Sequence, residues 1–386
     1  MNEAIAWTEL LAGVDWPDRD AGKAAEARWG TVAKPEGSLG RLESLGAWWC
    51  ATRGMCPAPP PERAVLIIFA ADHGVASVAR TSAYPPEVTA QMVRAFLHGR
   101  AAANALARQI GARVRVVDIG VDADPAYADD LDPDVARHRV RRGSGSIDRE
   151  DALTAEETAL AISAGAQIVD EEVDAGADLL ILGDMGIGNT TIGAVISGLL
   201  SPAEVTAVVG RGTGIDDATW MRKAAAVRDA MARGRPDKGS PVDLLARVGG
   251  ADLAAMTGAL LRAAGRRTPV ILDGTLPTAA ALVAHRAAFK SRDWWQAGHR
   301  STEPAQRAAL ARLDLEPLLD LELRLGEGTG ALLAVPLLAS AAAALAEMGT
   351  FADLGVSGPD GAPDSDRDGE PGPRPVGGAA PLGDPE

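Results

Sequence analysis

The sequence predicts an α/β fold built on a mostly parallel β-sheet, and two features of the 386-residue chain indicate it. Short, continuous apolar runs are typical of strands that are buried on both faces of a sheet. These runs lie at 65–69, 114–119, 179–182, 205–209 and 270–272, with a weaker candidate at 294–297. Alanine-rich helical stretches alternate with them, which predicts β-α-β units. Examples are 90–110, 155–173 and 252–264.

Helices are also predicted at both ends of the ordered part of the chain. Residues 1–49 form helical pieces around a loop at 34–40, and 57–61 is a stiff proline-rich linker. Residues 315–348 return to helix, interrupted by glycines at 326–330. The acidic, glycine- and proline-rich segment 353–386 has too few apolar side chains to fold, so we expect it to be a disordered tail.

Polar residues and glycines gather where the predicted strands end. Asp72 and His73 follow the first strand, Asp184 the third and Asp273 the fifth, while the loop 210–214 follows the run at 205–209. Ligands of open α/β sheets bind at the carboxyl ends of the strands. The pattern therefore predicts a ligand site at this edge of the sheet.

Charge and composition exclude several classes of protein. The net charge of −15 argues against general nucleic-acid binding, which needs a basic surface. The first 16 residues contain acids and no basic region, so they do not form a signal peptide, and we expect a cytoplasmic protein. The two cysteines and the spacing of the five histidines provide no zinc-binding pattern, so no metal is predicted.

The first glycine-rich loop, 186–191, lies between a predicted strand and a predicted helix. Backbone amides at a helix N-terminus form an anion site, and Gly186 and Gly188 allow a ligand to approach closely. Asn189 and Thr190 add donors. Because neither a Walker loop nor a dinucleotide motif is present, a monophosphate or phosphoribose fits better than a nucleoside triphosphate. A tight turn without a ligand is the alternative.

The second glycine-rich loop, 210–214, is followed by Lys223. This lysine could supply a positive charge to the same phosphate, or it could be an ordinary surface lysine on a helix. The role of His73 is similarly open, since a structural histidine and a catalytic one both fit its position beside Asp72.

Glu327 is the strongest catalytic candidate. Gly326 and Gly328 flank it, which leaves its carboxylate open to a flat ligand, and a helix follows. The positive end of a helix dipole favours the ionised form, and an ionised carboxylate is a base that takes a proton from a nucleophile. A helix-capping glutamate without chemistry is the alternative.

Taken together, these motifs resemble the nicotinate-nucleotide–dimethylbenzimidazole phosphoribosyltransferases of cobalamin lower-ligand synthesis. The resemblance spans roughly residues 5–352 in one register. The matching runs are 34–43, 71–75, 82–85, 183–191, 210–217, 273–274, 298–301, 317–330 and 347–351.

The resemblance implies a Rossmann-like parallel sheet with flanking helices in a large domain, 62–317. It also implies a small helical domain made of 1–56 and 318–352, and a homodimer. The implied reaction moves phosphoribose from nicotinate mononucleotide to 5,6-dimethylbenzimidazole with inversion at the anomeric carbon, and it needs no metal or other cofactor. The products are nicotinate and α-ribazole 5′-phosphate.

The resemblance also assigns roles to individual residues. Glu327 is the general base. The base-binding pocket comprises Ser82, Tyr84, Gln91 and Leu325. The phosphate and ribose are held by Asp184, Gly186, Gly188, Asn189, Thr190 and Lys223.

Four departures from the usual family pattern are present. Asp184 and Asp252 stand where glutamate is usual, Thr275 stands where phenylalanine is usual, and Ala305-Gln306 replaces a Gly-His pair. Because of these departures, the sequence does not fix the identity of the acceptor base. A related transferase acting on another azole or phenolic acceptor, and a non-catalytic nucleotide-binding regulator, are the alternatives.

Overall fold

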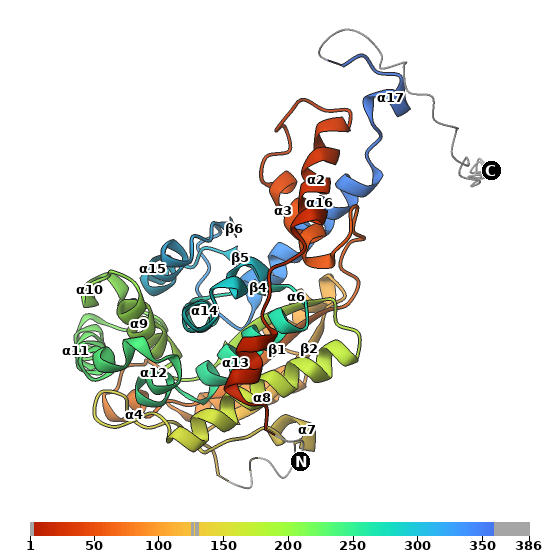
Figure 1. The fold of residues 1–386 in the computed structure, drawn as a ribbon. Helices are drawn as coiled ribbons and strands as arrows, with labels where there is room; N and C mark the ends of the chain where they lie inside the picture. Colours follow the sequence, from red (N-terminus) through yellow and green to blue (C-terminus); the bar gives the residue numbers. More distant parts are fainter. Residues whose placement is uncertain (1–3, 125–126, 128–130, 359–386) are drawn as a thin grey trace, which may run out of the picture.

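The computed structural model describes residues 4–124, 127 and 131–358. Most of the predicted disordered tail, 359–386, therefore lies outside the described residues. The described chain is built around one sheet with helices on both faces (Figure 1).

The sheet has six strands, all paired in parallel, in the order β2-β1-β3-β4-β5-β6. The strands are β1 (Ala64–Ala71), β2 (Arg113–Gly120), β3 (Leu179–Met185), β4 (Val270–Leu272), β5 (Trp295–His299) and β6 (Pro317–Leu319). This arrangement confirms the predicted α/β class with a parallel sheet.

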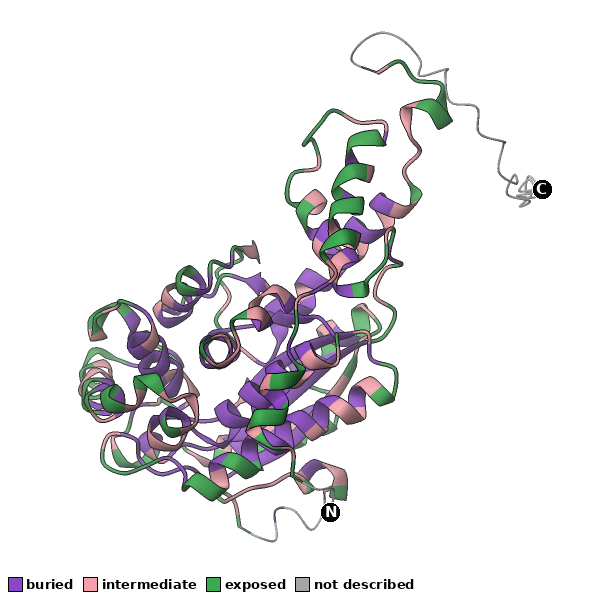
Figure 2. Cartoon of the chain, in the orientation of Figure 1, coloured by how far each residue is buried: buried purple, intermediate pink, exposed green. Residues whose placement is uncertain are grey.

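Alternating side chains of β1 contribute to two hydrophobic clusters, one on each face of the sheet. Ile67 and Phe69 belong to the first cluster, and Leu66 and Ile68 to the second. This is the expected result of the two-residue side-chain period of a strand. Figure 2 shows the sheet and the inward faces of its helices as buried.

The first cluster is covered by the helices α1 (Trp7–Gly13), α4 (Gly74–Val78), α8 (Ala155–Asp174), α9 (Asn189–Leu200), α10 (Val205–Val208), α11 (Asp217–Gly234), α12 (Pro241–Val248), α13 (Ala251–Gly265), α14 (Thr275–Ala287) and α15 (Pro304–Leu313). The second is covered by α2 (Arg19–Thr31), α3 (Arg41–Arg53), α5 (Glu87–Leu97), α6 (Ala102–Gln109), α7 (Pro133–Ala136) and α16 (Thr329–Glu347). Short elements complete the chain: the 3₁₀ helices η2 (Arg235–Gly239) and η3 (Phe289–Trp294), and α17 (Phe351–Leu354).

The helices α2 and α3 pack on each other and on α16, and this group projects from the sheet (Figure 1). By length and composition α16 could cross a membrane, but 56% of its apolar window is buried inside the protein. Core helices of soluble proteins pass the same test, so this is weak evidence for a membrane span. The division into domains at 1–56, 62–317 and 318–352 stays a prediction.

Two predicted elements are wrong. Residues 205–209 form the one-turn helix α10 rather than a strand, because a short apolar run has no periodicity to distinguish the two. Residues 315–328 are not helical: Pro317–Leu319 pairs with β5 as the edge strand β6, and the helix begins only at Thr329. The predicted helix at 90–110 is two helices, separated near Gly99, which has a φ of +69°.

Candidate active site

The loop that carries Glu327 lies at the carboxyl edge of the sheet and leads into α16. Gly326, Glu327 and Gly328 all have positive φ angles, of 83°, 61° and 83°. A non-glycine residue in this left-handed region is strained, and such strain is often stored at functional sites. The loop is tied to the protein by Asp273, whose carboxylate accepts hydrogen bonds from the backbone N–H groups of Gly328, Gly330 and Ala331.

The carboxylate of Glu327 is buried, with only 6% of the residue exposed. Its Oε2 atom has no hydrogen-bond partner among the described residues. Burial raises the pKa of Glu327 to about 7, and the charge of Asp273 adds to this effect. Burial therefore opposes the expected effect of the helix dipole, which favours the ionised form.

Asp184 lies at the end of β3, directly beside this loop. A Cβ added at Gly183 would come within 2.7 Å of the backbone carbon of Glu327, so only glycine allows the two segments to pack. The side chain of Asn189 donates a hydrogen bond to Asp184. Burial, and then the charge of Asp273, raise the pKa of Asp184 to about 7.

The loop 186–190 turns directly from β3 into the N-terminus of α9. Gly188 has a φ of +105°, and a Cβ at Gly186 would overlap the carbonyl oxygen of Ala71. Asn189 and Thr190 are the first residues of α9, so their amides lie at the positive end of the helix. This geometry suits an anion.

Lys223 of α11 points inward at this loop rather than into solvent. The residue is 1% exposed, and its Nζ donates a 2.8 Å hydrogen bond to Oγ1 of Thr190. Burial lowers the pKa of Lys223 to about 8, against the opposing charge of Glu303. A buried ammonium next to a helix N-terminus is a strong partner for an anion.

Glu303 is a residue of the site that sequence reasoning did not identify. It is 5% exposed, and its Oε1 accepts a 2.8 Å hydrogen bond from the N–H of Gly212 in the loop 210–214. On the other side of this loop, Nη1 of Arg324 donates to the carbonyl of Gly212 at 2.6 Å. The available signal was the acid-proline pair Glu303-Pro304, which marks the start of α15.

The residues predicted for the base-binding pocket lie on two segments. Ser82 and its neighbour Ala83 contact Oγ1 of Thr213, at 3.4 and 3.0 Å, so this segment is attached to the loop 210–214. Tyr84 and Leu325 are 55% and 57% exposed, and Gln91 is also exposed. The structure brings Leu325 together with Asp184, Asn189 and Thr190 around one cavity, which the other three residues do not line.

One small cavity joins the two halves of the candidate site. Its volume is about 30 Å³, and its lining residues include Asp184, Asn189, Thr190, Leu325 and Gly326. A cavity of this size holds about one water molecule, whereas small-molecule sites typically measure about 300–1,000 Å³. The cavity in this structure is therefore smaller than a bound nucleotide.

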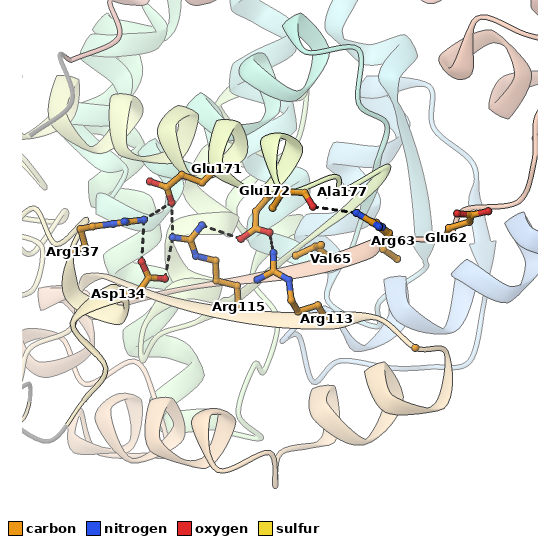
Figure 3. Close-up of a pocket in the computed structure, with 13 residues that line it drawn as sticks. Glu62, Arg63, Val65, Arg113, Arg115, Asp134, Arg137, Glu171, Glu172 and Ala177 are labelled. Atoms are coloured by element: carbon orange, nitrogen blue, oxygen red, sulfur yellow. Dashed lines mark hydrogen bonds and ion pairs between the residues drawn. The ribbon is translucent and has the colours of Figure 1, made fainter.

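A cavity of about 570 Å³ lies at the opposite edge of the sheet, but its chemistry is structural (Figure 3). Arg115, which is 8% exposed, is paired there with Glu171 and Glu172 at 2.6 and 2.9 Å. Four arginines and four acids line this cavity, so their charges balance. We interpret it as an ion-pair network that ties α7 and α8 to the start of β2.

His73 is paired with Asp252 inside the protein. Its Nε2 lies 3.1 Å from Oδ2 of Asp252, and both side chains are fully buried. Burial lowers the pKa of His73, but the charge and hydrogen bond of Asp252, together with the charges of Asp72 and Asp184, outweigh it, so the net pKa is raised. This pairing favours the structural role for His73, supporting the turn after β1.

A parallel sheet with a helix N-terminus suited to an anion and a buried carboxylate at its carboxyl edge fits a transferase that acts on a phosphorylated substrate. Comparison with known proteins agrees: the family model described as phosphoribosyltransferase matches residues 14–356. The chain is thus an enzyme of the pentosyltransferase class.

More particularly, the chain belongs to the nicotinate-nucleotide–dimethylbenzimidazole phosphoribosyltransferase family. A relative of that name from Mycolicibacterium paratuberculosis (strain ATCC BAA-968 / K-10) is 59% identical over 353 residues, covering 92% of this chain and 99% of the relative. One from Mycobacterium tuberculosis (strain ATCC 25618 / H37Rv) is 58% identical, covering 90% and 94%. The crystal structure of CobT from Thermus thermophilus is similar, with a TM-score of 0.83 and 42% identity, covering 88% of this chain and 99% of that one.

Proposed function

We propose that this enzyme transfers phosphoribose from nicotinate mononucleotide to 5,6-dimethylbenzimidazole, which yields nicotinate and α-ribazole 5′-phosphate. One observation carries the proposal. A single cavity joins the anion-binding residues Asn189 and Thr190 to Leu325 and Gly326, which directly precede the buried carboxylate of Glu327. A base and a phosphate cradle on either side of one cavity are what a phosphoribosyl transfer to an N–H heterocycle requires.

The proposed reaction is a displacement at the anomeric carbon. A ring nitrogen of the benzimidazole forms a bond to C1′ while the C1′–nitrogen bond to the pyridinium breaks, and the bonding electrons neutralise the departing nicotinate ring. No general acid is needed, and the carbon inverts. The N–H proton on the other ring nitrogen goes to the carboxylate of Glu327, whose raised pKa makes it a stronger base than an ordinary glutamate.

The remaining residues are assigned either to the phosphate and ribose or to the acceptor base. Lys223 and the amides at the start of α9 hold the 5′-phosphate, with Gly186 and Gly188 allowing its approach, and Asp184 lies on the ribose side. Ser82, Tyr84, Gln91 and Leu325 surround the acceptor base when it is bound. A cytoplasmic location and a homodimer, in which a second copy covers these exposed side chains, belong to the same proposal.

The test is chromatographic detection of α-ribazole 5′-phosphate from the two substrates in buffer without added metal. Glu327→Gln removes the proton acceptor, and we expect kcat to fall about 100-fold or more, with little change in nucleotide binding. Glu322→Gln is the matched control, because Glu322 also has a positive φ, of 56°, but is exposed. An unchanged kcat in Glu327→Gln would remove Glu327 from the mechanism.

A different acceptor is the second candidate, and Thr275 favours it. Thr275 lines the cavity, where its side chain fills less space than the phenylalanine that is usual at this position. Competition between 5,6-dimethylbenzimidazole, other azoles and phenols in the same assay decides the acceptor. Turnover with none of them contradicts the proposed reaction.

A further inference from the structure

Two loops of the candidate site are each held from behind by a buried acid. Asp273, which is fully buried, accepts three backbone N–H groups of the loop that carries Glu327. Glu303 accepts the N–H of Gly212 in the loop 210–214, which contacts Thr190 and Lys223. A Cβ at Gly212 would lie 2.9 Å from Oγ1 of Thr190 and 3.2 Å from Nζ of Lys223.

Gln306 of α15 connects the two acids. Its Nε2 donates to the backbone carbonyls of Asp273 and His299, at 2.7 and 3.1 Å. Its Oε1 accepts the N–H of Ser301 at 2.6 Å, and Oγ of Ser301 in turn accepts the N–H of Glu303 at 3.2 Å. The hydrogen bonds thus run without a gap from the Glu327 loop, through Asp273, Gln306, Ser301 and Glu303, to Gly212.

The amide of Gln306 is fully buried, and both of its N–H donors and its oxygen take part in hydrogen bonds. Removing it takes a partner from two carbonyl groups and one N–H, and a buried polar group that loses its partner is destabilising. The structural change that costs least free energy is a shift of the backbone segments that bear these polar groups. The same segments anchor the two loops.

We propose that Gln306 is a positioning residue that couples the Glu327 loop to the loop 210–214, so that the base and the phosphate-binding groups stay at a fixed separation. Gln306 lies behind both loops and reaches the substrates only through Asp273 and Glu303. The consequence for catalysis rests on the proposed function, because it assumes that Glu327 and Lys223 act on one substrate. The coupling between the loops does not rest on the proposed function, and it can be measured without turnover.

The first experiment is hydrogen–deuterium exchange on Gln306→Met, in which an apolar side chain of similar length replaces the amide. We expect peptides covering 210–216 and 323–331 both to exchange about tenfold faster than in the unmodified protein. Thr257→Val is the matched control, since it removes a buried 2.8 Å side-chain hydrogen bond within α13 and should leave both loops unchanged. If only one loop loosens, or neither does, the coupling does not exist.

A second variant guards against misfolding of the first. Gln306→His keeps one N–H donor and one acceptor on a smaller frame, so it should restore part of the protection in both loops. If Gln306→Met does not fold, Gln306→His still decides the question. Faster exchange in both loops supports the proposal, and unchanged exchange in either one overturns it.

The second experiment is a double-mutant cycle on kcat/KM with Gln306→Met and Glu303→Met, which removes the acceptor for the N–H of Gly212. If both changes break the same chain of hydrogen bonds, the double variant should be within about twofold of the worse single variant. Multiplication of the two effects would show that the residues act separately, which contradicts the proposal. Absence of turnover in the unmodified enzyme would contradict the proposed function alone, since the exchange result stands independently.

Discussion

The carboxylate of Glu327 titrates near neutrality because it is buried, and this predicts a pH profile. With a pKa of about 7, Glu327 is protonated below neutral pH and cannot accept a proton. We expect kcat/KM to rise tenfold per pH unit below about 7 and to level off above it. Initial rates between pH 5.5 and 8 measure this. A flat profile across that range would show that no group with this pKa acts as the base.

Lys223 predicts a limit on the alkaline side. Its pKa of about 8 is lowered by burial, so the ammonium loses its proton as the pH rises through that value. We expect nicotinate mononucleotide to bind more weakly above about pH 8, as measured by calorimetry from pH 7 to 9.5. Lys223→Met should weaken binding about tenfold or more and abolish this pH dependence. A pH dependence retained in Lys223→Met would assign it to another group.

Some of these residues could be predicted from the sequence and others could not. Glu327 stands out because two glycines flank it, which is a local signal. Its raised pKa depends on burial by segments that are far away in sequence, and no local pattern encodes that. The inward direction of Lys223 and the contact of Glu303 with Gly212 are likewise set by how α11 and α15 pack.

At the scale of elements, α8 and α13 cross closely at two glycines. A Cβ at Gly165 would overlap the carbonyl oxygen of Ala255, and one at Gly258 would overlap that of Ile162. Gly165→Ala should therefore lower the free energy of unfolding by about 1–3 kcal/mol, because the helices must separate. Chemical denaturation measures it.

The matched control for that substitution is Gly30→Ala in α2. Gly30 is exposed, and nothing lies within 4 Å of its added Cβ. The change should raise the free energy of unfolding by about 0.5–1 kcal/mol, because alanine favours a helix. Equal effects of the two substitutions would show that the close crossing does not matter.

The elements themselves were predictable where a pattern was long or buried on both sides. The runs at 65–69, 114–119 and 179–182 are strands of the sheet because parallel strands covered by helices on both faces need apolar residues on both faces. The run at 205–209 has the same composition but lies between α9 and α11, so tertiary position decided its helical form. The edge strand β6 has three residues, which is too short for any period to show.

At the scale of the whole molecule, α16 is held at both ends by side chains of opposite charge. Asp273 binds the amides at its N-terminus, while Arg28 of α2 donates to the carbonyls of Leu345 and Ala346 at its C-terminus, at 2.5 and 3.1 Å. Both charges complement the helix dipole. Each therefore stabilises α16 and also fastens it to a different part of the chain.

Arg28→Met tests the C-terminal attachment. We expect the free energy of unfolding to fall by about 1–2 kcal/mol, since the final carbonyls of α16 lose charged donors. Limited proteolysis should cleave the segment between α16 and α17 faster. Arg19→Met, at the start of the same helix α2, is the comparison, because that guanidinium lies over the ring of Trp16, away from α16. Identical stability of the two variants would contradict the role of Arg28.

Because α16 is attached at both ends, it connects two distant parts of the molecule rigidly. With 19 residues, α16 spans roughly 28 Å at 1.5 Å per residue, from the α2–α3 group to the residue that follows Gly328. A tilt of that distant helical group therefore reaches Glu327 as a displacement of its own backbone. The helix α16 bends most easily at Pro336, because proline leaves one helical hydrogen bond unmade. A partner that moved the α2–α3 group would therefore also move the backbone that carries Glu327.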